Sequence, residues 1–397
     1  MPAKSRSASS RGLHFNAGNG PFLQPVDIGH PEYVGVVEPD TAFWALVRKD
    51  RLADVLADES LLRKYRQKLD VLANEMKTLR FGLKPSAVYF NPTERCNLNC
   101  GYCYLPATMR RDGAHMSKPR LIEALSVLRE YFSKSLPGGI VPQIVFHGSE
   151  PLINREAVFA TIEEYKDDFR FGVQTNGTLL DDDAVGFLTS RGISLGLSLD
   201  GHVEAIADST RRNWAGDGVS RKVVSALERL QGYHSYSVIC TVTSANVRVL
   251  PEIVDFFHDL GVPVCMLNPV RCTQPGGRNL KPPDNEFTPH YLRALDRTYE
   301  LYRQTGRKLI VANFANILVG ILAPAGRQLM CDISPCGGGR CFFAVAATGD
   351  LFPCSEFIGL PEFRGGNLFH DDIDNVLDSP AFRQVIAQVP EHGPALN

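Results

Sequence analysis

The sequence predicts an α/β protein built on a partial (β/α)6 barrel. Six short β-rich runs alternate with helix-length segments between residues 87 and 269, which is typical of parallel strands joined by right-handed crossovers. A full eight-stranded barrel would need more chain than this region supplies. Hydrophobic residues make up 44% of the 397 residues and charged residues 22%, so the chain can bury a sizeable core.

Each predicted strand is an apolar run of four to seven residues, and each predicted helix has charged residues between its apolar positions. We expect strands at Ala87–Phe90, Gln143–Phe146, Arg170–Gln174, Ser194–Leu199, Ser237–Thr243 and Val264–Pro269. We expect helices near 118–134, 154–166, 181–191, 219–231 and 247–260, and a further helix at 288–306.

Two segments flank the predicted barrel, which we place at residues 85–310. Residues 1–84 form an N-terminal extension with a disordered start of about twenty residues and a helix from Thr41 to about Arg80. Its role, in packing or in substrate docking, is left open. Residues 311–397 form a small, Cys-rich α+β segment, in which Cys341–Ala347 and Leu351–Cys354 resemble two strands joined by a turn.

The charge balance and the cysteines narrow the function classes. A net charge of −2, from 42 basic and 44 acidic side chains, gives no reason to expect nucleic acid or an anionic membrane as partner. The apolar stretch Ile317–Ala323 is too short to cross a bilayer, and no signal-peptide pattern is visible, so we expect a cytoplasmic protein. Ten cysteines in a reducing compartment favour metal or redox sites over disulfides.

Cys96, Cys100 and Cys103 lie within eight residues, directly after the first predicted strand. Three thiolates can bind three irons of a cubane cluster and leave the fourth iron open, as in a catalytic metal site. A structural zinc site would need a fourth ligand, and the nearest histidine is His115. The loop also follows a strand, where barrel enzymes keep their chemistry.

The cysteine spacing, with Tyr102 just before the third cysteine, resembles the signature of the radical S-adenosylmethionine (SAM) superfamily. Three further segments support the resemblance, and they are especially similar to anaerobic sulfatase-maturing enzymes and their peptide-modifying relatives. These segments are Phe146-His-Gly-Ser-Glu-Pro-Leu152, which resembles a Gly-Gly-Glu-Pro turn, Gln174-Thr-Asn-Gly177 and Ser198-Leu-Asp-Gly201.

The resemblance implies that a [4Fe-4S] cluster on the three cysteines reductively cleaves SAM to a 5′-deoxyadenosyl radical. It implies that Tyr102 lies against the adenine and that Ser198 and Arg211, with Arg212 in reserve, contact the SAM carboxylate. The backbone of the second motif would hold the SAM amino group. The resemblance leaves the catalytic residue unknown, but it implies a cofactor-binding set of Tyr102, Gly148, Ser149, Glu150, Pro151, Gln174, Asn176, Ser198, Asp200 and Arg211.

A second cysteine group resembles the opening of a SPASM or twitch domain, which carries auxiliary Fe–S clusters. Cys336, Gly349 and Cys354 have the expected spacing, but no further cysteine follows Cys354. Four thiolates, those of Cys331, Cys336, Cys341 and Cys354, could bind one auxiliary cluster or a zinc ion. An incomplete remnant of such a domain is the third alternative.

These resemblances imply an enzyme that modifies a ribosomally made peptide, such as a bacteriocin-type precursor, and takes electrons from a flavodoxin or ferredoxin. A sulfatase-type maturase that forms formylglycine is a second reading, although its catalytic carboxylate cannot be placed in the sequence. A non-catalytic Fe–S scaffold is a third. Two of the remaining cysteines, Cys240 and Cys265, lie in apolar strands, and we expect them to be core residues.

Overall fold

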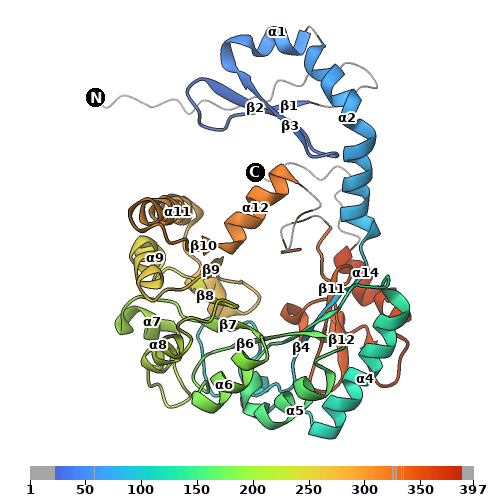
Figure 1. Ribbon diagram of the computed structural model, residues 1–397, viewed down its shortest axis with the longest axis vertical. Helices are drawn as coiled ribbons and strands as arrows, with labels where there is room; N and C mark the ends of the chain where they lie inside the picture. Colours follow the sequence, from blue (N-terminus) through green and yellow to red (C-terminus); the bar gives the residue numbers. More distant parts are fainter. Residues whose placement is uncertain are drawn as a thin grey trace. The chain divides into compact units, whose positions relative to one another are not determined.

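The computed structural model describes residues 23–57, 59–323, 326, 329–331, 333 and 335–386. The chain divides into two compact units, one of residues 1–83 and 318–327 and one of residues 84–317 and 328–397. We call them the N-terminal unit and the barrel unit, and Figure 1 labels most of their helices and strands. The expected disordered start of the chain lies outside the described residues.

The N-terminal unit is a three-stranded antiparallel sheet, in the order β1-β2-β3, with a helix packed on one face. Its small core includes Val36, Val47 and Leu61, and the rings of Phe43 and Tyr65 meet edge to face at 5.1 Å. The elements of this unit are β1 (Gln24–Val26), β2 (Tyr33–Glu38), β3 (Phe43–Arg48), α1 (Leu52–Ala57) and α2 (Ser60–Lys77).

The predicted helix from Thr41 to about Arg80 is wrong at its start, where the structure has strand β3. The segment alternates buried and exposed residues with period two, and Val47 pairs with Val34 across the hairpin. The Glu38 carboxylate accepts hydrogen bonds from the Thr41 amide at 2.8 Å and from the Thr41 hydroxyl at 2.5 Å. This local turn directs the chain into a hairpin, so the helical pattern begins only beyond β3.

The barrel unit confirms the predicted α/β class and a mostly parallel sheet. Its six central strands match the predicted ones to within one residue at each end and pair in parallel from β4 to β9. They are β4 (Ala87–Phe90), β5 (Gln143–Phe146), β6 (Arg170–Thr175), β7 (Ser194–Ser198), β8 (Tyr236–Val242) and β9 (Val264–Pro269). In the described residues the sheet stays open, because its two end strands do not pair with each other.

Four short strands extend this sheet at its two ends. β10 (Ile310–Val311) pairs in parallel with β9, and β11 (Phe342–Val345) pairs in parallel with β4. β12 (Asp350–Phe352) and β13 (Gly366–Asn367) continue the sheet antiparallel beyond β11. The pairing of β11 with β12 confirms the predicted pair of C-terminal strands. The Cys-rich segment therefore shares a sheet with the barrel, and the predicted boundaries at residues 84 and 310 stay a prediction.

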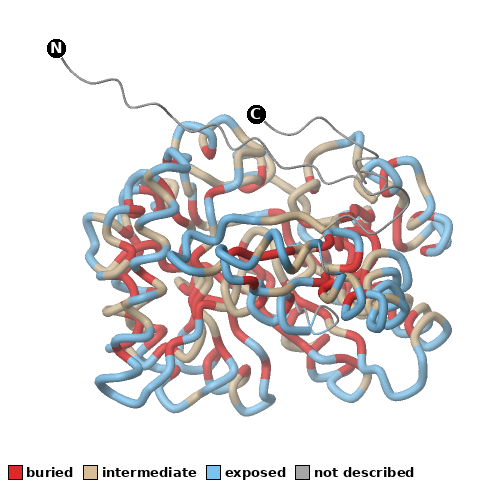
Figure 2. The backbone as a smooth tube through the Cα atoms, turned by 90° about the horizontal axis from the view of Figure 1, so that it is seen from above, coloured by how far each residue is buried: buried red, intermediate tan, exposed pale blue. Residues whose placement is uncertain are grey.

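Helices cover the outer face of the sheet, and a continuous apolar core fills the space between them. Leu125 of α4, Ile162 of α5 and Phe257 of α9 are fully buried there, and each such side chain stabilises the fold by roughly 1.5–3 kcal/mol. Figure 2 shows buried residues inside the array and exposed ones along the outer helices. Cys240 and Cys265 are also fully buried, which confirms their predicted core role.

The helices of this unit mostly follow their strands in chain order. They are α3 (Ala107–Asp112), α4 (Lys118–Ser135), α5 (Arg155–Tyr165), α6 (Asp182–Ser190), α7 (Glu204–Thr210), α8 (Ser220–Arg229), α9 (Leu250–Asp259), α10 (Pro275–Leu280), α11 (Asp284–Thr305), α12 (Ala312–Leu322), α13 (Ile373–Leu377) and α14 (Pro380–Ile386); α12 ends among the residues grouped with the N-terminal unit.

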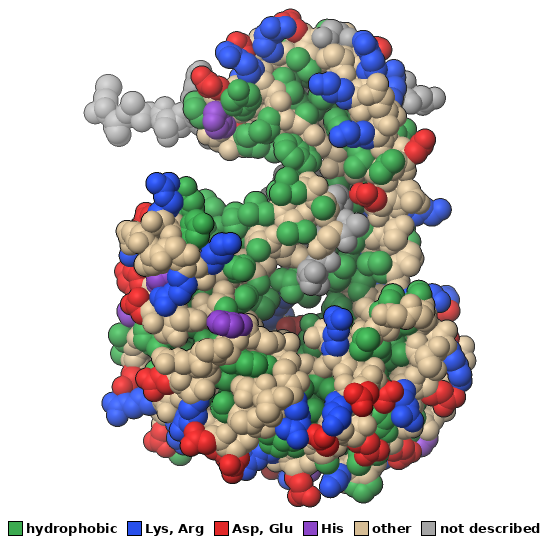
Figure 3. Space-filling view, viewed as in Figure 1, with side chains coloured by type: hydrophobic (Ala, Val, Ile, Leu, Met, Phe, Trp, Pro, Cys, Tyr) green, Lys and Arg blue, Asp and Glu red, His purple; other side chains and the backbone are tan. Residues whose placement is uncertain are grey.

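Two surface properties bear on the partners. Among the described residues, no helix has the length and apolarity needed to span a bilayer. Figure 3 shows acidic and basic side chains interspersed over the face in view, as the near balance of charges in the sequence suggests.

Candidate active site

The carboxyl ends of strands β4 to β9 surround a cavity of about 250 Å3 in the barrel unit. Because parallel strands end at the same edge of the sheet, motifs that lie far apart in the sequence meet there. Three predicted residues, Glu150, Pro151 and Asp200, are not among the described residues that line the cavity. The predicted residues that do line it are Cys96, Cys100, Tyr102, Cys103, Gly148, Ser149, Gln174, Asn176, Ser198 and Arg211.

The three cysteines lie on the loop between β4 and α3, which a buried arginine organises. The Arg110 guanidinium donates hydrogen bonds to the carbonyls of Leu98 at 3.1 Å and Leu105 at 3.2 Å, and the Arg110 carbonyl accepts from the Cys96 amide at 2.7 Å. A buried cation that satisfies several carbonyls holds an irregular loop in one shape. Sequence reasoning did not identify Arg110, because its role depends on tertiary contacts.

Burial raises the pKa of the Cys96 thiol to about 12 and that of the Cys103 thiol to about 11, and the neighbouring thiols repel one another's negative charge. Bound iron reverses this effect, because a metal favours the thiolate over the thiol. Among the described residues, no three His, Cys, Asp or Glu side chains are arranged around a single ion. The thiols that bind a cubane cluster lie farther apart than the ligands of a single ion, because each sulfur binds a different iron.

The turn after β5 is shaped by Gly148, whose backbone φ is +101°. A side chain at this position would collide with Asn91, because a Cβ atom would lie 2.1 Å from the Asn91 Nδ2 atom. The next residue, Ser149, donates a hydrogen bond from its hydroxyl to the Glu94 carbonyl at 2.6 Å. The turn therefore presents its backbone to the cavity and packs tightly on the loop after β4.

The Glu150 carboxylate lies behind this turn and joins it to the end of β6. It accepts hydrogen bonds from the amides of Leu152 at 3.0 Å and Asn176 at 2.7 Å, and from the Thr175 hydroxyl at 2.8 Å. Burial raises the pKa of Glu150 to about 6, although these hydrogen bonds oppose the shift. Glu150 thus positions other residues of the cavity wall, including Asn176, and does not itself face the cavity.

Arg211 and Asp200 form a buried pair bridged by Tyr102. The Tyr102 hydroxyl donates to Asp200 at 2.5 Å and accepts from Arg211 at 2.7 Å, while the Thr241 amide also donates to Asp200 at 2.8 Å. Within the described residues the Arg211 Nε atom is buried without a hydrogen-bond partner. A buried donor with spare capacity beside a cavity suits a carboxylate ligand. Arg212, by contrast, is exposed.

Comparison with known proteins decides the family. An uncharacterized protein of Archaeoglobus fulgidus is 43% identical over 326 residues, which cover 82% of this chain and 73% of that protein. The Radical SAM superfamily pattern matches residues 90–260, the stretch that contains every motif of the cavity. The chain belongs to the radical SAM superfamily.

Two further likenesses describe its neighbours in this superfamily. The cysteine-type anaerobic sulfatase-maturating enzyme of Clostridium perfringens is 25% identical over 306 residues, which cover 72% of this chain and 78% of that enzyme. The crystal structure of Streptococcus suis SuiB bound to the precursor peptide SuiA superposes with a TM-score of 0.60 at 12% identity, covering 92% of this chain and 91% of SuiB. The second likeness shows the shared fold.

Radical SAM enzymes use SAM and a [4Fe-4S] cluster, which confirms the cofactors expected from the sequence. The residues of the cavity fit both groups. Three thiols lie on one loop at the cavity, a tight glycine turn exposes backbone, and the buried Arg211 has an unused donor. Which atom of SAM or of the cluster each of these residues contacts stays a prediction.

The second cysteine group lies in the loops around β11 and β12 of this radical SAM protein. The Gly338 amide donates to the Cys336 sulfur at 3.4 Å. Burial raises the pKa of the Cys354 thiol to about 12, and the thiols of Cys331 and Cys336 add to that shift. Cys341 is likewise buried. Burial raises the pKa of the Cys341 thiol, and the Cys336 thiol adds to that shift. Cys354 is therefore near Cys331 and Cys336, and Cys341 is near Cys336. An auxiliary cluster on these four thiols stays a prediction.

Two lining residues carry chemistry that the sequence reasoning missed. His147 precedes the glycine turn, and Glu356 comes from the segment after β12. Glu356 lies 3.7 Å from Arg271, and burial raises the pKa of its carboxyl group. No sequence signal marks Glu356, because only the pairing of β11 with β4 brings it to the cavity.

The buried imidazole of His147 makes stability depend on pH. Burial lowers its pKa from 6.5 to about 4, so protonation disfavours the folded state, and stability falls as pH drops from about 6.5 through about 4. We expect the protein without cofactors to lose about 2 kcal/mol of unfolding free energy from this group between about pH 7 and about pH 5. Urea unfolding of wild type and His147→Gln at both pH values checks this. An equal loss in the variant would contradict it.

Proposed function

We propose that this radical SAM enzyme modifies a peptide or protein substrate, most simply a ribosomally made precursor peptide. When bound, the cluster and SAM together supply a 5′-deoxyadenosyl radical that removes hydrogen from an unactivated C–H bond. In this proposal, Arg211 and Ser198 hold the SAM carboxylate, the Gly148 turn holds its amino group, and Tyr102 packs on its adenine. The residues that line the cavity orient the reacting groups and exclude water.

One observation carries the choice of a peptide substrate. Strand β3 lies at the edge of its sheet and pairs, within the described residues, only with β2. A groove of about 530 Å3 runs between β3 and α2 in the N-terminal unit. An unpaired strand edge beside a groove is the geometry that accepts an extended peptide as an added strand.

The side chains of this groove favour an extended peptide with apolar and acidic residues. Trp44 is 41% exposed and Leu46 is 55% exposed, which is unusual for large apolar side chains of a strand. The basic residues Lys64 and Lys68 also line the groove, as do Arg48 and Arg51, which are paired with Asp50 and Asp54. SuiB, whose likeness extends over this part of the chain, was crystallised with its precursor peptide, which supports the same choice.

The proposal is tested with peptides encoded by short reading frames beside the gene. The reconstituted enzyme is incubated anaerobically with SAM, a reductant and each peptide, and both 5′-deoxyadenosine and peptide mass are measured. We expect one such peptide to stimulate 5′-deoxyadenosine formation and to lose hydrogen atoms through a new crosslink. Steady 5′-deoxyadenosine formation without any change in peptide mass would contradict the proposal.

A variant in the groove tests where the peptide binds. We expect Leu46→Glu to raise the KM for the peptide at least about tenfold, because it replaces an apolar contact with a charge that repels an acidic peptide. SAM cleavage without peptide should not change. Val71→Glu is the matched control, since Val71 is 62% exposed in the same unit and does not line the groove. Equal KM values in both variants would contradict this binding site.

Sulfatase-type maturation is a second candidate, and Glu356 favours it. Conversion of a cysteine to formylglycine requires loss of protons, and a half-buried carboxylate with a raised pKa suits the base. The anaerobic sulfatase-maturating relative is consistent with this chemistry. A cysteine-containing sulfatase peptide that loses its sulfur in wild type, and much less in Glu356→Gln, would favour this candidate over the first.

A further inference from the structure

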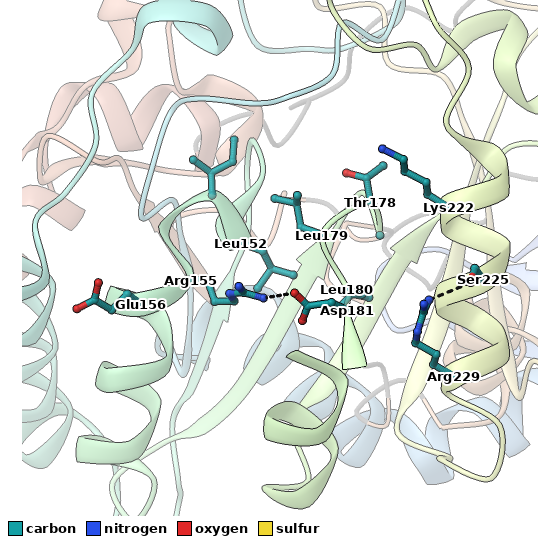
Figure 4. Close-up of a pocket in the computed structure, with 12 residues that line it drawn as sticks. Leu152, Arg155, Glu156, Thr178, Leu179, Leu180, Asp181, Lys222, Ser225 and Arg229 are labelled. Carbon is teal, nitrogen blue, oxygen red and sulfur yellow. Dashed lines mark hydrogen bonds and ion pairs between the residues drawn. The ribbon is translucent and has the colours of Figure 1, made fainter. Parts of the chain in front are cut away.

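Asn176 lies at the carboxyl end of β6, where the chain turns away from the cavity. Its side chain is 6% exposed, and its backbone amide donates to the Glu150 carboxylate at 2.7 Å. Asn176 lines the cavity, whereas Thr178, two residues further on, lines a separate groove of about 510 Å3. Figure 4 shows Thr178 among the residues of this groove. This short turn therefore separates the cavity from the groove.

Three side chains at this turn form a closed ring of hydrogen bonds. The Asn176 amide nitrogen donates to the Asn97 side-chain oxygen at 2.8 Å, and the Asn97 amide nitrogen donates to the Thr178 hydroxyl at 2.8 Å. The Thr178 hydroxyl then donates to the Asn176 side-chain oxygen at 2.6 Å. Because each side chain donates to the next, the three hold one another in one orientation.

The hydrogen-bonding capacity of the Asn176 side chain is fully used inside the protein. An asparagine side chain offers two N–H groups and one oxygen with two lone pairs. The oxygen accepts from both the hydroxyl and the backbone amide of Thr178, the latter at 2.9 Å. One N–H group goes to Asn97, and the other goes to the Cys96 sulfur, which lies 3.8 Å from the Asn176 nitrogen. A SAM contact through this side chain would have to replace one of these bonds.

The bond to Cys96 sets this cysteine apart from the other two of its loop. In the described part of the chain, Asn176 is the one side chain that donates to a sulfur of Cys96, Cys100 or Cys103. The Cys96 sulfur also accepts from the Leu98 backbone amide at 3.4 Å. Hydrogen bonds to a ligand sulfur stabilise the more negative, reduced state of an iron–sulfur cluster, so they raise its reduction potential.

We infer that Asn176 is a positioning residue, which donates to the Cys96 sulfur, raises the reduction potential of the cluster and is not a SAM ligand. One electron passes from a reductant to the cluster, and no bond is made or broken. The Asn176 N–H dipole stabilises the negative charge that this electron adds at the Cys96 sulfur. Asn97 and Thr178 keep the dipole pointed at that sulfur.

The reduction potential of the reconstituted protein without SAM tests the inference, in a dithionite titration followed by electron paramagnetic resonance. Asn176→Leu removes the donor at similar volume, and Thr178→Val removes one member of the ring. Asn154→Leu is the matched control, because Asn154 is 7% exposed and its amide nitrogen donates to the Pro92 and Met116 carbonyls instead of to a sulfur. The SAM dissociation constant of each variant is measured separately.

We expect Asn176→Leu to lower the equilibrium constant for cluster reduction at least about threefold, which is about 28 mV at about 59 mV per tenfold. Thr178→Val should shift the potential in the same direction by less, and Asn154→Leu should leave it unchanged. An equal shift in Asn154→Leu would overturn the inference, as would an Asn176→Leu protein that loses SAM affinity at an unchanged potential.

If Asn176→Leu does not hold a cluster, Thr178→Val decides the question. An unchanged potential in Thr178→Val would then contradict the inference, because the ring would not act on the Cys96 sulfur. No peptide is present in these measurements, so the proposed function is not at stake.

Discussion

Arg211→Gln should weaken SAM binding at least about thirtyfold, because its guanidinium is a buried cation of the cavity whose Nε has no hydrogen-bond partner among the described residues. Arg211 is 6% exposed and donates to the Tyr102 hydroxyl, which in turn bonds the buried Asp200 carboxylate. Removal of one partner from a buried, hydrogen-bonded charge pair costs about 2–5 kcal/mol, since the other charge stays buried. In this case the SAM carboxylate and Asp200 would both lose their cation. Isothermal titration of the reconstituted protein with SAM measures the effect.

Two variants separate binding from folding. Arg212→Gln is the matched control, because Arg212 is exposed and, within the described residues, its guanidinium donates only to the carbonyls of Asp208 and Gly216. It should bind SAM as wild type does. Arg211→Lys keeps the charge and should recover part of the affinity, unless the variant merely unfolds. Wild-type affinity in a folded Arg211→Gln protein would show that the carboxylate is held elsewhere.

Gly148→Ala should destabilise the protein by about 3 kcal/mol or more and also abolish tight SAM binding. The residue has a φ of +101°, and a Cβ atom would lie about 2.1–2.3 Å from the side chain of Asn91. An alanine there is strained both by its backbone conformation and by overlap with a buried neighbour. Relief requires the turn to move, and the turn's backbone is the part that we expect to hold SAM. Urea unfolding and SAM titration measure the two consequences.

Gly186→Ala is the control for this substitution. Gly186 lies inside α6, and a Cβ atom there would meet nothing within 4 Å. The same chemical change should therefore stabilise the protein by up to about 1 kcal/mol, because alanine favours the helix. If Gly148→Ala and Gly186→Ala had equal stability and SAM affinity, the tight packing of the turn on Asn91 would be irrelevant to the site.

The barrel could be predicted from the sequence because its strands read as short apolar runs, and the central ones are buried on both faces. The consecutive residues Ile144, Val145 and Phe146 of β5 are all buried. Strand β3 could not be predicted in the same way. Its Trp44 and Leu46 are exposed, so an edge strand with apolar residues on both faces resembled the start of the helix that follows.

Some residues of the candidate site could likewise be predicted from the sequence, and others could not. Motif residues on loops after strands, such as Gly148 and the three cysteines, could be located because each motif is local in the sequence. Residues whose role comes from tertiary contacts were either missed, as Arg110 and Glu356 were, or expected in a different role, as Glu150 was. Arg110 acts through the carbonyls of the cysteine loop, Glu150 turns away from the cavity to hold the end of β6, and Glu356 arrives through the pairing of β11 with β4.

Iron and sulfide content after anaerobic reconstitution tests the central claim most directly, with wild type compared with the triple variant Cys96→Ala/Cys100→Ala/Cys103→Ala. Cys272→Ala serves as the control, since this half-buried thiol belongs to neither cysteine group. The account predicts that the triple variant loses one [4Fe-4S] cluster relative to wild type and to the control, and all SAM cleavage with it. Any iron left in the triple variant would then belong to the group around Cys354. A triple variant with as much iron as wild type, still able to cleave SAM, would contradict the assignment.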